Sequence, residues 1–388
     1  MFRLLKYHVR SALVRWRTTV ATVAGIAVVV WVFVFVQSLA VGIELASGNT
    51  GDPRNLLITR KGALAESTSI VTREQFNIIR YLPGVARGTS GTPIASADLL
   101  VIINRPRLNG SGNANVLVRG VSPAGIEMRP QAALVDGRWF RPGQREVVAS
   151  RRLAARFKGL QVGSSFQAVG QTLTVVGLFD AQRSAFDSEV WMDADEARNV
   201  FDRADYGSIL LRPIDEAGAV AFKKAIESDK RLKMKISREV DYYKEQTRTA
   251  LLPRYLGRFL AVVMSIGAVF AAMNTLYASV GARTREVGTL RVLGFRRRNI
   301  LFGFLVEGAL LAGIGGAIGC VIAYLSADGY SVGTFGFETF SETVFDLKVT
   351  PALALRGFVF SLILGLVGSF LPALRASRLP VISSLKSA

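Results

Sequence analysis

Two long apolar runs constrain the fold of this chain more than any other feature of its sequence. They extend from Leu256 to Gly281 and from Ile300 to Leu325, and each contains one charged residue, Arg258 or Glu307. At about 1.5 Å per helical residue, each run is long enough to cross the ~30 Å hydrocarbon core of a bilayer. The sequence therefore predicts a membrane hairpin of two helices.

The connector between these runs, residues 282–299, fixes the orientation of the hairpin. Its eighteen residues, ARTREVGTLRVLGFRRRN, contain six arginines and one acidic residue, Glu286. Short loops that are rich in arginine remain on the cytoplasmic side during membrane insertion. We therefore expect the connector to face the cytoplasm.

The connector also has a pattern that is typical of a short helix. Val287, Leu290 and Leu293 recur at every third residue, which gives a helix over about 283–293 one apolar edge. Gly294 follows, and glycine suits the left-handed position that ends a helix. Two interpretations fit this pattern equally well: a helix that docks on another protein, or a segment that lies flat among the lipid headgroups.

The distribution of charge argues against nucleic-acid binding, although the chain has a formal net charge of +19. Residues 1–17 and the connector each carry +5, and the residues after Leu374 carry +3, all on the predicted cytoplasmic side. Residues 42–255 contain 31 basic and 23 acidic residues, without an arginine-rich helix or an aromatic stacking motif. The charge is therefore interpreted as a topology signal, and no nucleic-acid partner is expected.

The residue types that support catalysis or metal binding are scarce. Cys320 and His8 are the only cysteine and the only histidine, which excludes an intramolecular disulfide and a multi-histidine zinc site. Ser331 lies in a G-x-S-x-G match, GYSVG, but His8 is predicted on the opposite side of the membrane and could not serve as its base. We expect no catalytic residue and no metal site.

The chain is expected to be an α-helical membrane protein with four transmembrane helices and a large α+β extracytoplasmic domain inserted between helices 1 and 2. A cytoplasmic amphipathic helix is predicted over residues 1–17 and a cytoplasmic tail over 375–388, so that both termini are cytoplasmic. The predicted spans are residues 18–41, 256–281, 300–325 and 357–374.

Two segments are expected outside the membrane. Residues 42–255 contain short β-rich runs and turn clusters, and we expect two subdomains, the second beginning near Gly137, followed by a polar stalk helix over 238–250. Residues 326–356 are predicted as an extracytoplasmic loop. Phenylalanines 335, 337, 340 and 345 lie in it, and we expect them to contact a hydrophobic substrate or the outer domain of a partner.

Small residues and one carboxylate mark the interior of the spans. Gly315 and Gly319 form a small-xxx-small face, as does Gly365 with its serine neighbours, and such faces favour close helix packing or dimerisation. Glu307 is about two turns from the cytoplasmic end of its run. A structural ion pair near the connector helix is favoured for it over a proton or substrate site.

Five motifs resemble those of one family, the MacB/FtsX-type (type VII) ABC transporter permeases. TREVGTLRVLGFRRRNI with FLVEG is similar to its coupling segment and third helix, and LPALRASRLPVISSL at 371–385 to its C-terminal signature. In the outer region, LPGV ending at Val85, DGRWF at 136–140 and LTVVGLF at 173–179 resemble its periplasmic core domain. Together these motifs extend over nearly the whole chain, and they occur in the order that the family has.

The resemblance implies a permease in the bacterial inner membrane that pairs with a second copy or a paralogue. It implies two cytoplasmic ABC ATPase subunits as partners, surrounding membrane lipids and a periplasmic adaptor protein. Such permeases are thought to act by mechanotransmission. The implied ATPase-coupling interface comprises Arg283, Arg285, Glu286, Gly288, Leu290, Arg291 and Gly294.

MacB itself carries an ATPase domain, whereas this sequence has no G-x-x-x-x-G-K-[ST] motif and no Gly-Lys dipeptide. We therefore expect ATP and Mg²⁺ to be bound by a partner chain, with no cofactor on this one. Two functions remain open. The first is export or lipoprotein and lipid handling; the alternative is an FtsX-like regulator that activates an extracytoplasmic partner, such as a cell-wall hydrolase, without moving a substrate.

Overall fold

The computed structural model describes residues 16–89, 91–110, 112–229, 231–249, 251–335 and 342–379. The amphipathic helix predicted over 1–17 lies almost wholly outside the described residues, as does most of the predicted tail. The chain divides into a membrane unit, residues 1–41, 252–330 and 347–388, and an outer unit, residues 42–251 and 331–346.

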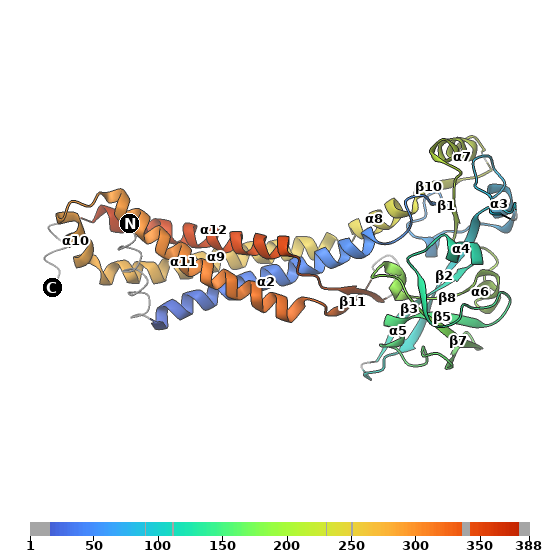
Figure 1. The fold of residues 1–388 in the computed structure, drawn as a ribbon, viewed down its shortest axis with the longest axis horizontal. Helices are drawn as coiled ribbons and strands as arrows, with labels where there is room; N and C mark the ends of the chain where they lie inside the picture. Colours follow the sequence, from blue (N-terminus) through green and yellow to red (C-terminus); the bar gives the residue numbers. More distant parts are fainter. Residues whose placement is uncertain are drawn as a thin grey trace. The chain divides into compact units, whose positions relative to one another are not determined.

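The membrane unit contains four helices that are long and apolar enough to cross a bilayer, which confirms the predicted number of spans among the described residues. They are α2 (Trp16–Gly48), α9 (Leu251–Ala282), α11 (Arg297–Ala327) and α12 (Pro351–Arg378), and they run alongside one another in Figure 1. The short helix α10 (Thr284–Val292) connects α9 to α11.

The helices are longer than the apolar runs that predicted them. The span expected at residues 357–374 belongs to a helix that starts at Pro351, where the Thr350 hydroxyl accepts a hydrogen bond from the Leu353 amide at 3.2 Å. Arg356 lies inside this helix. Because it is charged, the apolar run in the sequence began only after it, and the first residues of the helix were left out. Hydropathy therefore located the membrane-crossing part, whereas capping residues determine where the helix begins.

Glycines bring the membrane helices into close contact. A Cβ added at Gly315 would lie 2.8 Å from the Val23 carbonyl oxygen of α2, and one at Gly319 would lie 2.5 Å from the Ala27 carbonyl oxygen. Gly365 belongs to α12, and a Cβ added there would lie 2.3 Å from the Cβ of Ala312 on α11. All three glycines thus pack within the chain, and their predicted role in dimerisation stays a prediction.

The outer unit is built on a mixed ten-stranded sheet with the order β10-β1-β9-β2-β3-β8-β5-β7-β4, and β6 pairs with β7. The pairs β3–β8 and β5–β7 are parallel, and the other pairs are antiparallel. The strands are β1 (Leu56–Arg60), β2 (Ala95–Pro106), β3 (Asn113–Val121), β4 (Ala133–Gly137), β5 (Glu146–Ser150), β6 (Ser165–Ala168), β7 (Gln171–Asp180), β8 (Glu189–Asp193), β9 (Ser208–Leu211) and β10 (Met234–Arg238).

Short helices accompany this sheet (Figure 1). They are α3 (Arg73–Ile79), α4 (Pro123–Glu127), α5 (Arg151–Ala154), α6 (Ala194–Val200), α7 (Glu216–Ser228), α8 (Glu239–Thr249) and the 3₁₀ turns η1 (Glu66–Thr68) and η2 (Ala185–Ser188). The helix α8 is the stalk helix predicted over 238–250.

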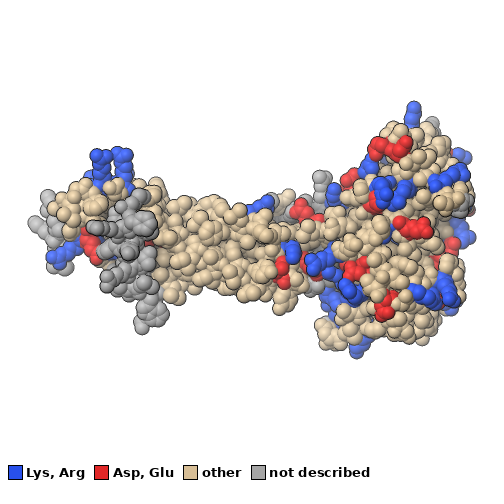
Figure 2. Space-filling model, viewed as in Figure 1, with Lys and Arg blue, Asp and Glu red and all other residues tan. Residues whose placement is uncertain are grey.

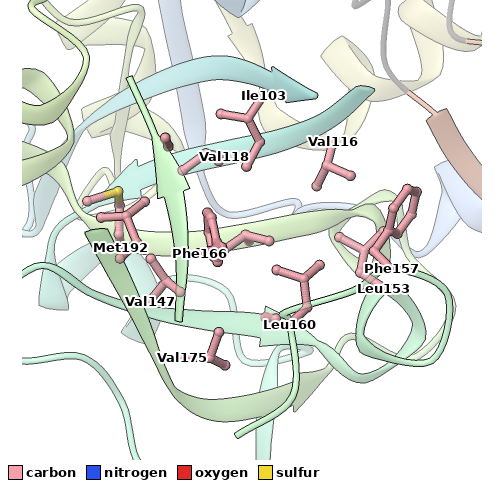
Figure 3. Close-up of a cluster of buried hydrophobic side chains, with 14 of the residues drawn as sticks. Ile103, Val116, Val118, Val147, Leu153, Phe157, Leu160, Phe166, Val175 and Met192 are labelled. Atoms are coloured by element: carbon pink, nitrogen blue, oxygen red, sulfur yellow. The ribbon is translucent and has the colours of Figure 1, made fainter. Parts of the chain in front are cut away.

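Two of the three apolar cores among the described residues of the outer unit do not follow the subdomain boundary predicted near Gly137. One core collects residues between Leu99 and Phe201 (Figure 3), so Gly137 lies within the range of a single core. The other joins residues 56–97 to 194–234, because β9 inserts between β1 and β2. Two segments that are far apart in the sequence therefore form the second core. A single boundary at one residue cannot separate such a core from the rest of the outer unit.

The predicted loop 326–356 contains a β-hairpin, β11 (Ser331–Phe335) and β12 (Glu342–Asp346), which belongs to the outer unit. Asp346, at the end of β12, accepts hydrogen bonds from both terminal nitrogens of Arg152 at 2.7 and 2.8 Å. Phe337 and Phe340 lie outside the described residues. The expected contact of the phenylalanines with a substrate or partner stays a prediction.

Gly319→Ala tests the close packing of α11 on α2. The added methyl group meets a backbone oxygen of α2, so we expect the variant to lose about 1–3 kcal/mol of stability. Gly25→Ala is the matched control, since nothing lies within 4 Å of a Cβ at Gly25. Thermal unfolding in detergent micelles should show a lower midpoint for Gly319→Ala only; equal midpoints would contradict this packing.

Candidate functional site

The helix predicted in the arginine-rich connector is present as α10, and its ending explains the glycine that follows it. The Gly294 amide donates to the Arg291 carbonyl oxygen at 3.2 Å, and the Phe295 amide donates to the Leu290 carbonyl oxygen at 3.1 Å. This pair of bonds is a Schellman motif, with Gly294 in the left-handed conformation at φ 88°. The motif stops α10 and turns the chain toward α11.

One face of α10 is part of the apolar core of the membrane unit. Val287 is buried and packs in a cluster whose other members come from the three helices around it: Val280, Ile300, Phe304, Ala373 and Ala376. Gly288 is buried beside it. A displacement of α10 would therefore disturb the packing of α9, α11 and α12 directly, because interiors are close-packed.

A buried ion pair holds the start of α10 to α11. Arg283 precedes the first residue of α10, and its Nη1 donates to Glu307 Oε2 at 2.9 Å. Arg283 is 4 % exposed and Glu307 is 6 % exposed. The structural ion pair predicted for Glu307 is thereby confirmed. Each charge requires the other, since an unpaired charge at this depth is very costly.

The opposite face of α10 is exposed and ends in two apolar side chains. Val292 is 61 % exposed and Leu293 is 70 % exposed. Arg285 and Glu286 are exposed on the first turn of α10, about two turns earlier on the same face. Figure 2 shows the uncharged surface of the membrane unit, with basic residues gathered at the α10 end. This surface, defined here as Arg285, Glu286, Val292 and Leu293, is called the α10 surface below.

The predicted coupling residues therefore divide between the two faces of α10. Arg283 and Gly288 are buried within this chain and could not touch a partner, Leu290 and Arg291 are half-buried, and Gly294 is exposed. The single apolar edge expected from Val287, Leu290 and Leu293 is divided as well, because Val287 faces inward. Val292 was not among the predicted coupling residues. Its position as an apolar residue in the last turn of a helix that ends at a glycine could have indicated it.

A second group of charges lies buried in the outer unit. Its members are fully or almost fully buried ionic side chains: Glu66, Asp98, Arg119, Arg129, Glu189 and Glu239. Arg119 Nε donates to Glu189 at 2.7 Å and its Nη1 donates to Glu66 at 3.1 Å. These contacts connect β3, β8 and η1. These buried charges resemble those of a functional site. The described residues contain no set of three or more side chains placed to hold a metal ion.

The same charge group reaches the stalk helix α8. Arg129 donates to Asp98 at 2.7 Å through Nη2 and to Glu239 at 3.1 Å through Nε. Glu239 is the first residue of α8, and its other oxygen accepts from the Asp52 amide at 2.9 Å. The start of α8 is therefore fixed to the sheet by charge-assisted bonds.

The pKa of Glu66 reports how strongly this group favours its charged form. Burial alone would raise the pKa, but the charge and hydrogen bonds of Arg119, with Ser208 and Arg129, outweigh it and lower the pKa below the ordinary 4.5. Burial is the main cause that raises the pKa of Tyr243, which donates to Glu66 at 3.1 Å. Glu66 is thus an ionised acceptor and Tyr243 a neutral donor at neutral pH.

Breaking the Arg283–Glu307 pair from one side should destabilise the membrane unit. In Glu307→Gln, Arg283 stays buried without its counter-charge, and we expect a loss of about 3–5 kcal/mol. The double variant Arg283→Met/Glu307→Leu removes both charges and should recover most of that loss. Thermal unfolding in detergent measures all three proteins; a double variant no more stable than Glu307→Gln would contradict the pairing.

The stability of the outer unit should depend on Glu66 in a pH-dependent manner. Because the folded pKa of Glu66 is lowered, its contribution is fully present above pH 4.5 and is lost as the pH falls through the folded pKa. Glu66→Gln should therefore destabilise the protein at pH 7. The difference in free energy of unfolding between wild type and variant should shrink toward pH 3. Urea unfolding of the full chain in detergent gives both profiles; parallel profiles would show that Glu66 is not the group responsible.

Two family models match successive parts of the chain. Residues 18–229 match the family model described as the MacB-like periplasmic core domain, which covers more than half of the chain. Residues 258–381 match the model described as the FtsX-like permease C-terminal domain. Neither match is to an ATPase domain.

Two relatives illustrate the level of similarity. The chain is 34 % identical over 134 residues to the pyoverdine export ATP-binding/permease protein PvdT of Pseudomonas entomophila, a region that is 34 % of this chain and 18 % of that protein. It is 32 % identical over 116 residues to the uncharacterized ABC transporter permease YvrN of Bacillus subtilis, covering 29 % of this chain and 26 % of YvrN. The chain therefore matches about a fifth to a quarter of the length of these relatives.

Among solved structures, the periplasmic region of MacB from Actinobacillus actinomycetemcomitans aligns with 52 % of this chain and 94 % of its own. The sequence identity is 14 % and the TM-score is 0.38.

Proposed function

This chain belongs to the MacB- and FtsX-type permeases of ABC transporters, and we propose that it is a membrane subunit driven by a separate ATPase. The α10 surface is the proposed docking site for that ATPase, on the cytoplasmic side, with both termini on the same side. ATP and Mg²⁺ would be bound by the ATPase, two copies of which would serve a pair of permease chains. Family membership implies ABC ATPase partners in general.

The observation that carries this proposal is the division of α10 into a fixed face and an open face. The inner face joins the core through Val287 and the Arg283–Glu307 pair. The outer face offers two exposed apolar side chains, Val292 and Leu293, beside charged ones. Apolar anchors within a polar rim are the usual basis of a protein interface. A push on the outer face would therefore be transmitted to three membrane helices.

Export, or the handling of lipoproteins or lipids, is the transport function that we propose for the complex. It is supported by a relative whose name describes export of pyoverdine, and by a large folded outer unit. A second permease chain and a periplasmic adaptor would complete the assembly. An FtsX-like regulator that activates an outer partner is the alternative, and identification of the chains that co-purify with this protein separates the two functions.

Val292→Asp/Leu293→Asp tests the docking site. The variant places two carboxylates where apolar contacts are proposed, and we expect loss of ATPase co-purification and of permease-stimulated ATP hydrolysis in lipid nanodiscs. The fixed face is untouched, so thermal stability in detergent should stay at the wild-type value. Ile214→Asp is the control, because Ile214 is also an exposed apolar side chain but belongs to the outer unit. Normal co-purification of the double variant would refute the docking site.

A further inference from the structure

The membrane helices connect to the outer unit through three segments of that unit. The first is the C-terminal part of α2, which continues into residues 42–48. The second is α8, which precedes α9 in the chain. The third is the hairpin β11–β12, which lies between α11 and α12 in the chain. One turn of the outer unit contacts all three.

The 3₁₀ turn η2 meets each of these segments with a different residue. Toward α2, the Ala185 amide donates to Thr50 Oγ1 at 2.8 Å, and the same hydroxyl donates to the Ala46 carbonyl oxygen of α2 at 2.7 Å. Thr50 is buried, so its hydroxyl is protected from water. One side chain therefore joins the end of α2 to η2.

The second residue of η2 contacts α8. The rings of Phe186 and Tyr243 are 5.6 Å apart and nearly perpendicular, the edge-to-face arrangement that aromatic pairs favour. The guanidinium groups of Arg119 and Arg129 lie over the Phe186 ring at 5.5 and 5.2 Å. Phe186 thus links η2 to α8 and to the buried charge group that fixes Glu239.

The third residue of η2 contacts the hairpin through Arg152. Arg152 Nε lies 3.3 Å from Asp187 Oδ2, while its two terminal nitrogens donate to the carboxylate of Asp346 on β12. Arg183, just before η2, also reaches Asp346 at 2.9 Å. β12 additionally packs against η2. The hairpin is therefore attached to η2 by paired charges on two arginines.

The backbone that leads into η2 is held in a demanding conformation. Gln182 and Arg183 have φ of 53° and 64°, a left-handed region that residues with a side chain adopt only when their surroundings hold them there. Asp187 holds this turn by accepting hydrogen bonds from the Ala181 and Arg183 amides, both at 2.8 Å. A change in η2 would therefore alter the whole turn rather than one contact.

We propose that η2 is the junction through which displacements of the α2 end, α8 and the β11–β12 hairpin are combined and passed to the outer sheet. Its output is direct, because η2 is followed immediately by β8, near the middle of the sheet order. Ala185, Phe186 and Asp187 act as positioning residues. This inference rests on the proposed function only for the source of the movement; the junction itself is a property of this chain.

Hydrogen exchange of the full-length protein in nanodiscs tests the junction without any ATPase. In Asp346→Asn the change lies on the hairpin, and exchange is read at the Ala185 amide, which bonds to Thr50. In Thr50→Val the change lies at the end of α2, and exchange is read at the β12 amides. Coupling between sites is reciprocal, so we expect exchange to rise about fivefold or more at the distant position in both variants.

Two matched controls separate coupling from general destabilisation. Thr50→Ser keeps the hydroxyl and should restore slow exchange in β12. Asp229→Asn breaks an exposed ion pair with Arg231 at 2.6 Å and should leave both positions unchanged. A rise of less than about fivefold at either distant position, or an equal rise in the Asp229→Asn control, overturns the proposal.

The junction and the proposed function fail separately. Loss of exchange coupling while the ATPase still docks on α10 would remove the junction alone. Normal co-purification of Val292→Asp/Leu293→Asp, with exchange coupling intact, would remove the docking site alone.

Discussion

The ion pair between Arg283 and Glu307 is the contact on which the packing of α10 against the membrane helices depends. It places an arginine from the start of α10 beside a carboxylate inside a membrane helix, 24 residues further along the chain. Burial away from water makes each charge costly there, and pairing with the other charge compensates that cost. The pair therefore determines which face of α10 is buried and, as a result, which residues remain open on the other face.

The outer unit also contains buried arginines paired with carboxylates, in a larger group. Arg119 and Arg129 are fully buried among carboxylates that come from η1, β2, β8 and α8. Buried charge-assisted bonds have defined directions, so they allow few alternative positions. The stalk helix and the sheet are thereby expected to respond to a load as one body.

The sequence predicted the features that depend on local composition. The four spans, the stalk helix and α10 were evident because hydropathy, arginine enrichment and the glycine at 294 act over a few residues. The β-rich character of the outer unit was evident for the same reason, and the motif at 173–179 lies within β7.

The remaining features depend on partners that are distant in sequence. The contacts of Arg119 with Glu66 and Tyr243 join residues 53 and 124 positions apart, and no periodicity encodes them. The inward face of α10 was ambiguous, since nine residues form little more than two turns and both Val287 and Leu293 fit an apolar edge. The hairpin at 331–346 was predicted as a loop, because its strands are short and its attachment through Asp346 is made to an arginine 194 positions away.

The glycine contacts between α2 and α11 have a consequence for how the protein is made. Ile26 and Gly315 pack together but are separated by roughly 290 residues, so a ribosome adding about 5–20 residues per second needs about 15 to 60 s to synthesise the second partner after the first. During that interval α2 is without its contacts to α11, while the residues of the outer unit are synthesised. Membrane insertion and final assembly are therefore two events separated in time, and the last quarter of the chain determines when the bundle closes.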